Sequence, residues 1–160
     1  MIAAERCTKV PDRALIVDID GTLADSAWRN SWAQAGEWDE FHERSIEDSP
    51  RRDVADLIIH MVPINWDVII CTGRPSNYRR LTLDWLDKYD LSPFVDELLM
   101  RPAYDYRPDA EVKRELVERH FGGWDVAQER VAFVLEDRDK VCDMWRNHGL
   151  VCWQVQPGGY

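Results

Sequence analysis

Short apolar runs, each followed at once by polar residues, recur along the chain. They are rich in β-branched side chains and cover residues 14–17, 68–71, 98–100, 131–135 and 150–155. Continuous apolar runs of this length are typical of strands that are buried on both faces of a sheet. The pattern therefore predicts about five buried strands.

Segments with a helical spacing of apolar residues lie between these runs. They cover residues 28–46, 53–61, 76–89, 109–121 and 141–148. Ser76 and Asp109 are candidate N-caps, and Gly149 is the expected stop of the last helix. Buried strands that alternate with helices predict an α/β fold with a parallel sheet covered on both faces. Ligands of such sheets bind beyond the carboxyl ends of the strands, so the polar residues after the runs should converge on one site.

Carboxylates dominate two of these polar clusters. Asp18 and Asp20 follow the first run, and Glu136, Asp137 and Asp139 follow the fourth. Several carboxylates in one crevice repel one another, and a hard divalent cation such as Mg²⁺ relieves the repulsion. The sequence therefore predicts a magnesium site at this edge of the sheet.

Other residues near the expected strand ends suit a phosphate. Thr72 offers a hydroxyl, a turn at Gly73 exposes backbone N–H groups, and Lys113 and nearby arginines add positive charge. Taken singly, these features have plainer interpretations: a D-x-D-G-T segment is often only a turn, and a lone lysine is usually solvated. A calcium loop starting at Asp18 is excluded, because Arg29 stands where the loop needs its bidentate Glu. The phosphate site is predicted from the order of the groups, each after a strand.

Composition narrows the classes of function. The chain has 160 residues, of which 45% are hydrophobic and 31% charged, as expected for a globular domain with its own core. A net charge of −10 argues against a broad nucleic-acid-coating surface, but it permits local recognition of one phosphate. The sequence shows no membrane span, no secretory signal in residues 1–10 and no C-x-x-C pair. We therefore expect a cytoplasmic protein that does not bind membranes.

Four motifs occur in order along the chain: D-I-D-G-T at 18–22, T-G-R at 72–74, Lys113, and E-D at 136–137. This ordered set resembles the haloacid dehalogenase (HAD) superfamily of phosphotransferases. The resemblance implies a Rossmann-like HAD fold with a minimal helical cap. It also implies that Asp18 is a nucleophile that forms an aspartyl-phosphate, and that Asp20 acts as acid and then as base.

The same resemblance implies roles for the other motif residues. Thr72 would hold the phosphoryl oxygens and Lys113 would neutralise their charge. Mg²⁺ would be held by Asp18, the backbone carbonyl of Asp20, and Asp137, with Glu136 as a ligand directly or through water. The second Asp of the motif favours phosphate chemistry over attack on carbon–halogen bonds.

A closer resemblance covers residues 99–113 and 135–155, together with Arg29, eleven residues after Asp18. These segments are similar to the 3′-phosphatase half of bacteriophage polynucleotide kinases. The resemblance implies a polynucleotide 3′-phosphatase that acts on the 3′ ends of DNA or RNA, beside a separate kinase or ligase of the same repair pathway. In that family, four arginines and one aspartate support the phosphatase site. They match Arg29, Arg74, Arg101, Arg138 and Asp109 of this chain.

The chain departs from this family in two ways. Glu136 stands where those enzymes usually have Asp, and no G-x-x-x-x-G-K-[ST] motif occurs. We therefore expect residues 1–160 to form a single phosphatase domain without a kinase half. A small lid of one or two helices should lie within residues 23–66.

Two other functions stay open on the sequence alone. One is a general HAD phosphomonoesterase acting on nucleotides or other small phosphates, and the other is a binding module that kept the fold without catalysis. The aromatic residues of the lid also have two interpretations, because they could stack on a terminal base or pack the lid against the sheet. They are Trp28, Trp32, Trp38 and Phe41.

Overall fold

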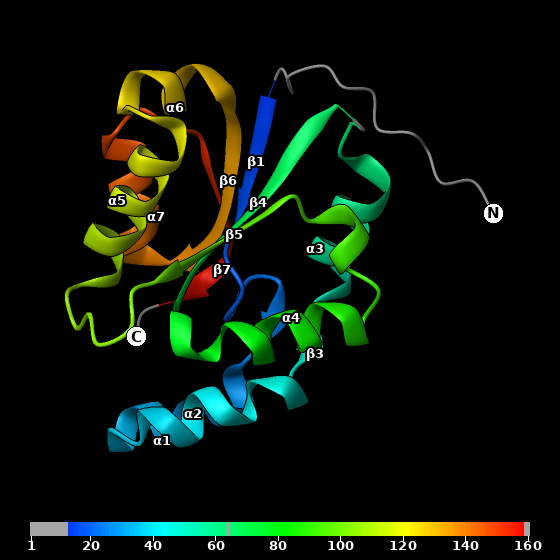
Figure 1. Ribbon diagram of the computed structural model, residues 1–160, viewed down its shortest axis with the longest axis vertical. Helices are drawn as coiled ribbons and strands as arrows, with labels where there is room; N and C mark the ends of the chain where they lie inside the picture. Colours follow the sequence, from blue (N-terminus) through cyan, green and yellow to red (C-terminus); the bar gives the residue numbers. More distant parts are fainter. Residues whose placement is uncertain (1–12, 64, 159–160) are drawn as a thin grey trace.

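A parallel sheet forms the centre of the protein in the computed structural model, which describes residues 13–63 and 65–158 (Figure 1). Within these residues the sheet has five strands in the order β5-β4-β1-β6-β7, and each neighbouring pair is parallel. In that order the strands are β5 (Glu97–Arg101), β4 (Trp66–Pro75), β1 (Arg13–Val17), β6 (Val131–Arg138) and β7 (Cys152–Gly158). The predicted fold class is confirmed. The expectation for residues 1–10 concerns a segment outside the described residues.

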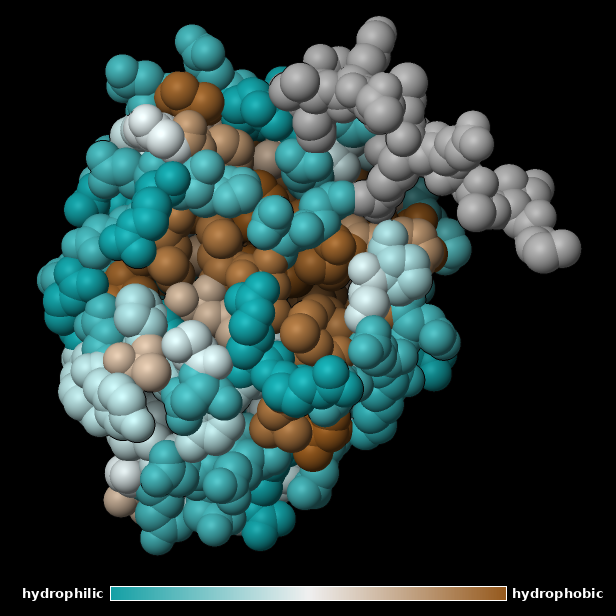
Figure 2. Space-filling view, viewed as in Figure 1, coloured by the Kyte–Doolittle hydropathy of each residue, from teal (hydrophilic) through white to brown (hydrophobic). Residues whose placement is uncertain are grey.

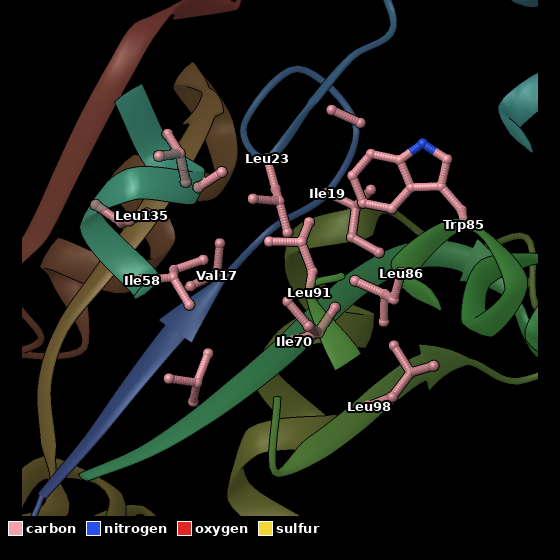
Figure 3. Close-up of a cluster of buried hydrophobic side chains, with 14 of the residues drawn as sticks. Val17, Ile19, Leu23, Ile58, Ile70, Trp85, Leu86, Leu91, Leu98 and Leu135 are labelled. Atoms are coloured by element: carbon pink, nitrogen blue, oxygen red, sulfur yellow. The ribbon is translucent and has the colours of Figure 1, made fainter. Parts of the chain in front are cut away.

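The central strand is buried on both faces, as its apolar run predicts. Leu15 and Val17 pack into one core, and Ala14 and Ile16 pack into the other. This alternation follows from the two-residue repeat of a strand. Figure 3 shows the first core, in which Val17 lies near Ile70 of β4, with residues of the following loop above them.

Helices cover the two faces of the sheet (Figure 1). One layer holds α3 (Arg52–Asp56), the π-helical turn η3 (Leu57–Met61) and α4 (Arg79–Lys88), with the short 3-10 helix η5 (Ser92–Phe94) after it. The other layer holds α5 (Asp109–Phe121), α6 (Trp124–Arg130) and α7 (Asp139–Asn147). The predicted helix at 53–61 thus changes to a π-helical turn after Asp56, and α6 was not predicted.

The lid lies beyond the carboxyl ends of the strands, at the bottom of Figure 1. In place of the one or two helices expected there, it contains η1 (Ala27–Arg29), α1 (Asn30–Ala35), α2 (Trp38–Glu43) and η2 (Arg44–Glu47). Gly36 ends α1 with a φ of +77°, a conformation that glycine adopts without strain. An antiparallel pair, β2 (Ala24–Asp25) and β3 (Ser49–Pro50), closes the base of the lid. Strands of two residues are too short to be predicted from a sequence pattern.

Both predicted N-caps are wrong, whereas the expected stop at Gly149 is confirmed by its φ of +82° just after α7. Pro108 is the N-cap of α5, and Asp109 is the first helical residue. Ser76 begins the 3-10 helix η4 (Ser76–Tyr78), and its Oγ accepts a hydrogen bond from the Ala103 N–H at 3.1 Å. The side chains of Ser76 and Asp109 therefore bond residues outside their own helices and do not cap them.

The surface is mostly polar. Figure 2 shows apolar residues gathered near the middle of one face, where Figure 1 places the edge strand β5 between the two helical layers. Among the described residues, no helix is long and apolar enough to cross a membrane.

Candidate active site

The turn after β1 fixes two carboxylates at the end of the central strand. Gly21 has a φ of +90°, and its N–H donates to the Ala24 carbonyl at 2.9 Å. Ile19 and Leu23 are fully buried and point into the core (Figure 3). Because these two apolar side chains anchor the turn in the core, Asp18 keeps a fixed position at the end of the strand.

Asp18 shares one lysine with other carboxylates. Lys113 of α5 donates to Asp18 Oδ1 at 2.7 Å and to Glu136 Oε2 at 2.8 Å. Lys113 Nζ also lies 3.2 Å from Asp109 Oδ2. Burial lowers the pKa of Lys113, but the three carboxylates outweigh burial and raise it well above its usual value. Lys113 is therefore a buried cation and not the solvated helix residue of the plainer interpretation.

The carboxylates around Lys113 carry more negative charge than the lysine neutralises. Burial and the charge of Glu136 raise the pKa of Asp18 well above its usual value, and burial also raises the pKa of Glu136. Ligand oxygens of Asp18, Glu136 and Asp137 lie within 4.8 Å of one another. An all-oxygen donor set with excess negative charge fits Mg²⁺. Asp139 is exposed at the start of α7 and bonds Gln154 at 2.6 Å, so it lies outside this set.

Asp20 has the opposite surroundings. Arg29 Nη2 donates to Asp20 Oδ1, and Arg74 Nη2 donates to the same oxygen at 2.6 Å. Arg74 Nε donates to Asp20 Oδ2 at 3.0 Å. Burial alone would raise the pKa of Asp20, but Arg74 and Arg29 outweigh burial and hold that pKa well below its usual range. This arrangement therefore favours the carboxylate form of Asp20.

Asp48 holds these two arginines from the lid side, and sequence reasoning missed it. Its Oδ2 accepts from Arg29 Nη2 at 2.6 Å and from Arg74 Nη2 at 3.4 Å. Its Oδ1 accepts from Arg29 Nε at 2.8 Å and from Trp28 Nε1 at 2.9 Å. The Trp85 indole N–H donates to the Asp48 backbone carbonyl at 2.9 Å, which attaches the lid to the core.

The sequence holds no signal for the role of Asp48. It lies among other acids and arginines between Glu47 and Asp53, and its neighbours on both sides are polar. Only the fold distinguishes Asp48, which is fully buried, from Asp53, whose side chain is 64% exposed.

Thr72 and Gly73 lie near the carboxyl end of β4, beside this cluster. Thr72 is fully buried, and its Oγ1 accepts a hydrogen bond from the Arg74 N–H at 3.2 Å. A Cβ added at Gly73 would lie 2.5 Å from Asp109 Oδ1, so any side chain there would displace that carboxylate. The need for glycine at this position is therefore steric.

Asp109 joins the Lys113 group to two further arginines. Arg101 donates to Asp109 Oδ1 at 2.9 Å, and Arg138 donates to Asp109 Oδ2 at 3.3 Å. Arg101 also donates to the backbone carbonyl of Gly73 at 2.9 Å. The Arg101 side chain is only 13% exposed, whereas that of Arg138 is 39% exposed. Arg101 therefore holds loops in place, and Arg138 is open to solvent.

The aromatic residues of the lid divide into two kinds. Phe41 is buried under the Arg29 guanidinium, 4.0 Å from its ring centroid. Trp28 bonds Asp48 as described above, and its ring lies edge-on to Trp32 at 5.7 Å. These three pack the lid itself. Trp38 packs edge-on to Phe41 at 5.8 Å, and Trp28 and Trp38 both keep exposed ring surface, at 45% and 56%.

The structure thus gathers the predicted site residues around the ends of β1, β4 and β6 and the start of α5. It brings together Asp18, Asp20, Arg29, Thr72, Gly73, Arg74, Arg101, Asp109, Lys113, Glu136, Asp137 and Arg138.

Comparison with known proteins identifies the family. The model of the polynucleotide kinase PNKP phosphatase domain matches residues 12–160. Two solved structures of a Pnkp1/Rnl/Hen1 complex, one titled an RNA repair complex, are each 32% identical in sequence, with TM-scores of 0.78 and 0.77. They align with 93% and 96% of this chain but with only 47% and 45% of the matched chains. This chain therefore spans less than half the length of those relatives.

More distant structures share the fold alone. CbbY from Rhodobacter sphaeroides, solved in complex with phosphate, has a TM-score of 0.62 at 17% identity over 92% of this chain and 87% of that chain. A hydrolase from Streptococcus pneumoniae TIGR4 has a TM-score of 0.60 at 14% identity over 92% and 94%. The motif-based resemblance is confirmed by the family match. This chain is a HAD-superfamily phosphatase that belongs to the PNKP phosphatase domain family.

Proposed function

We propose that this chain is a Mg²⁺-dependent polynucleotide 3′-phosphatase that removes terminal 3′-phosphates from DNA or RNA. The family match across residues 12–160 supports the substrate class. The observation that carries the chemistry is the placement of Asp18 and Asp20 on one tight turn, one carboxylate beside a lysine in an acidic cluster and the other between two arginines.

The proposed reaction has two halves. In the first, an Asp18 carboxylate oxygen attacks phosphorus, the bond from phosphorus to the 3′ oxygen breaks, and protonated Asp20 gives its proton to that oxygen. In the second, water attacks the phosphorus of the aspartyl-phosphate and gives a proton to Asp20. Inorganic phosphate then leaves and Asp18 is restored.

The surroundings of Asp20 favour one of these halves. The arginines stabilise its anionic form, which is the form that accepts a proton from water. The first half needs the protonated form, which the arginines disfavour. We therefore propose that Arg29 and Arg74 orient Asp20. Protonation of Asp20, which the first half requires, would then be the less favourable of its two proton transfers.

The remaining site residues have proposed roles around the phosphate. Lys113 would neutralise charge on the phosphoryl oxygens, and the Thr72 hydroxyl and the Gly73 N–H would bond them. Arg101 and Asp109 would position the Gly73 loop, and Arg138, which is open to solvent, would contact the substrate.

A metal fits the same site. Asp18, Glu136 and Asp137 would hold Mg²⁺ through their carboxylates, together with the backbone carbonyl of Asp20. A bound Mg²⁺ would offset the negative charge of the phosphate and of these carboxylates.

The proposal extends to partners. The titles of the matched structures describe Pnkp1 in a complex with Rnl and Hen1. By analogy, we propose that this chain acts beside a separate kinase or ligase and contacts nucleic acid only near the 3′ end.

The proposal also covers domain organisation and setting. Residues 1–160 would form one phosphatase domain with a lid within 23–66. Because these residues contain no P-loop motif, the proposal includes no kinase activity for them. Buried free thiols at Cys71, Cys142 and Cys152 support a reducing, cytoplasmic setting.

The test is phosphate release with Mg²⁺ from matched oligonucleotides that carry a 3′-phosphate or a 5′-phosphate, beside p-nitrophenyl phosphate. We expect preference for the 3′-phosphate and loss of turnover by several orders of magnitude in Asp18→Asn, with an unchanged circular dichroism spectrum. Equal cleavage of all three substrates would favour a general phosphomonoesterase. No release by folded wild-type protein would favour the binding module.

A further inference from the structure

A cluster of three rings lies where the lid meets η4. His42 of α2 packs against Tyr78 of η4, with ring centroids 5.0 Å apart, and Trp38 also stacks on His42, at 6.4 Å and 29°. The Tyr78 hydroxyl donates to Asp39 Oδ1 at 2.7 Å, which holds the tyrosine on the lid. The stack ends at Trp38, which is 56% exposed and therefore offers ring surface to solvent.

This cluster lies on the Asp20 side of the active site. Arg29, which donates to Asp20, also donates to the backbone carbonyl of Phe41 at 2.8 Å, and Phe41 directly precedes His42. The charges of Asp20, Arg74 and Arg29 all act on the His42 imidazole. In the proposed reaction Asp20 protonates the leaving oxygen, so the leaving nucleoside must occupy the side of the site that Asp20 faces.

Two buried nitrogen atoms in this region have no hydrogen-bond partner within the described part of the chain. They are Arg74 Nη1 and His42 Nδ1, and the two side chains are 0% and 8% exposed. A buried polar atom without a partner is destabilising, and a ligand with polar oxygens would satisfy it. A sugar attached to the scissile phosphate carries such oxygens.

The charge around the rings disfavours a phosphate as the ligand. Helix α2 carries exposed carboxylates at Asp39, Glu40 and Glu43, and Glu37 precedes it. Such a surface repels a nucleic-acid backbone but accepts an uncharged base, and base–aromatic stacking does not need positive charge.

We propose that Trp38, His42 and Tyr78 form a subsite for the terminal nucleoside of the substrate. The terminal base stacks on the open face of Trp38, and its sugar bonds Arg74 Nη1 and His42 Nδ1. This inference rests on the proposed 3′-phosphatase function and adds the means by which an acidic protein holds a polynucleotide end.

The test compares two 3′-phosphorylated oligonucleotides that differ only at the terminal nucleotide, which is normal in one and abasic in the other. We expect kcat/KM of the wild type to fall about tenfold on the abasic substrate, mainly through KM, because stacking contributes about 1–3 kcal/mol per base. The kcat/KM of Trp38→Ala should fall by about the same factor on the normal substrate, and it should equal the wild-type value on the abasic substrate. Trp38→Phe should restore most of the difference. Trp153→Ala is the matched control, because Trp153 is 52% exposed on β7 and packs on Phe133.

Each result supports or overturns the subsite. If the wild type cleaves both oligonucleotides equally, or if Trp38→Ala loses equally on both, base stacking is wrong while the 3′-phosphatase function stands. If the wild type cleaves p-nitrophenyl phosphate but neither oligonucleotide, the polynucleotide function and the subsite both fail. His42→Phe keeps an aromatic ring and removes the nitrogen atoms, so it should slow cleavage of both oligonucleotides by a similar factor. Unchanged rates would overturn the sugar contact.

Discussion

The candidate active site has two halves, each of which combines carboxylates with basic side chains but in different proportions. In the lysine half, Asp18 and Glu136 share Lys113 and lie beside Asp137. Asp109 also contacts Lys113, but Arg101 and Arg138 bond it as well. In the arginine half, Asp20 and Asp48 face Arg29 and Arg74. One half therefore has excess negative charge, and the other is balanced.

This difference separates two tasks. Burial, together with the charge of Glu136, raises the pKa of Asp18, and excess negative charge in a buried site favours a bound cation. Balanced charge with many hydrogen bonds fixes side chains in one arrangement, as the bonds from Arg29 to Asp20, Asp48 and the Phe41 carbonyl show. We infer that the lysine half binds ions and the arginine half sets geometry. Three measurements would test this division.

The largest expected effect on stability is in the arginine half. Asp48→Ala removes the lid-side partner of two buried guanidinium groups and should lower the free energy of unfolding by about 3–5 kcal/mol. Urea denaturation followed by circular dichroism measures this. Asp53→Ala is the control, because its exposed pair with Arg51 should contribute only about 0–1 kcal/mol. Equal losses in the two variants would show that the buried arginines do not depend on Asp48.

The second measurement concerns the lysine half. Mg²⁺ at about 100 times its dissociation constant should raise the free energy of unfolding by about 2.7 kcal/mol, because the cation binds only the folded cluster. Thermal melting with Mg²⁺ and with EDTA measures the shift. Asp137→Asn should abolish it, whereas Asp143→Asn, an exposed helical carboxylate outside the cluster, should keep it. A shift that survives Asp137→Asn would place the cation elsewhere.

The smallest effect is the pH dependence of stability without metal. The pKa of Asp18 is raised in the folded state, so its charge costs stability at neutral pH and the cost disappears as pH falls toward the usual value of 3.8. The pKa of Asp20 is lowered, so its contribution is present above 3.8 and is lost only as pH falls below that value.

Urea unfolding in EDTA between about pH 8 and about pH 4 compares the wild type with Asp18→Asn and Asp20→Asn. The stability advantage of Asp18→Asn over the wild type should shrink toward acid pH. The deficit of Asp20→Asn should stay constant across the same range. Parallel curves for the two variants would contradict the contrast between the two halves.

Much of the fold and of the candidate site could be predicted from local pattern. Continuous β-branched runs identified the buried strands of the sheet, because burial on both faces requires such runs. The ordered groups from Asp18 to Asp137 could be placed together, because parallel strands bring their carboxyl ends to one edge. Strand ends were less predictable, and β4 continues to Pro75 because Thr72 and Pro75, beyond the apolar run, still pair with β5.

The predictions that were wrong concern features that depend on contacts between residues far apart in the sequence. The local pattern predicts Asp109 as a helix cap, yet its carboxylate bonds Arg101 and Arg138. The lid pattern predicts one or two helices, yet the chain breaks at Gly36 and forms two short α-helices flanked by 3-10 helices. No local pattern shows which Trp will be exposed.

The sequence by itself therefore determined the α/β class, the family and the set of groups that meet a phosphate, since these follow from short-range periodicity and from motifs of adjacent residues. Only the tertiary structure decided how charge is divided between the two halves. Lys113 meets Asp18 across 95 residues of sequence, and Asp48 meets Arg74 across 26. Whether a carboxylate is buried, and which cation it faces, depends on packing between segments that are far apart in the chain, and one-dimensional patterns do not contain that information.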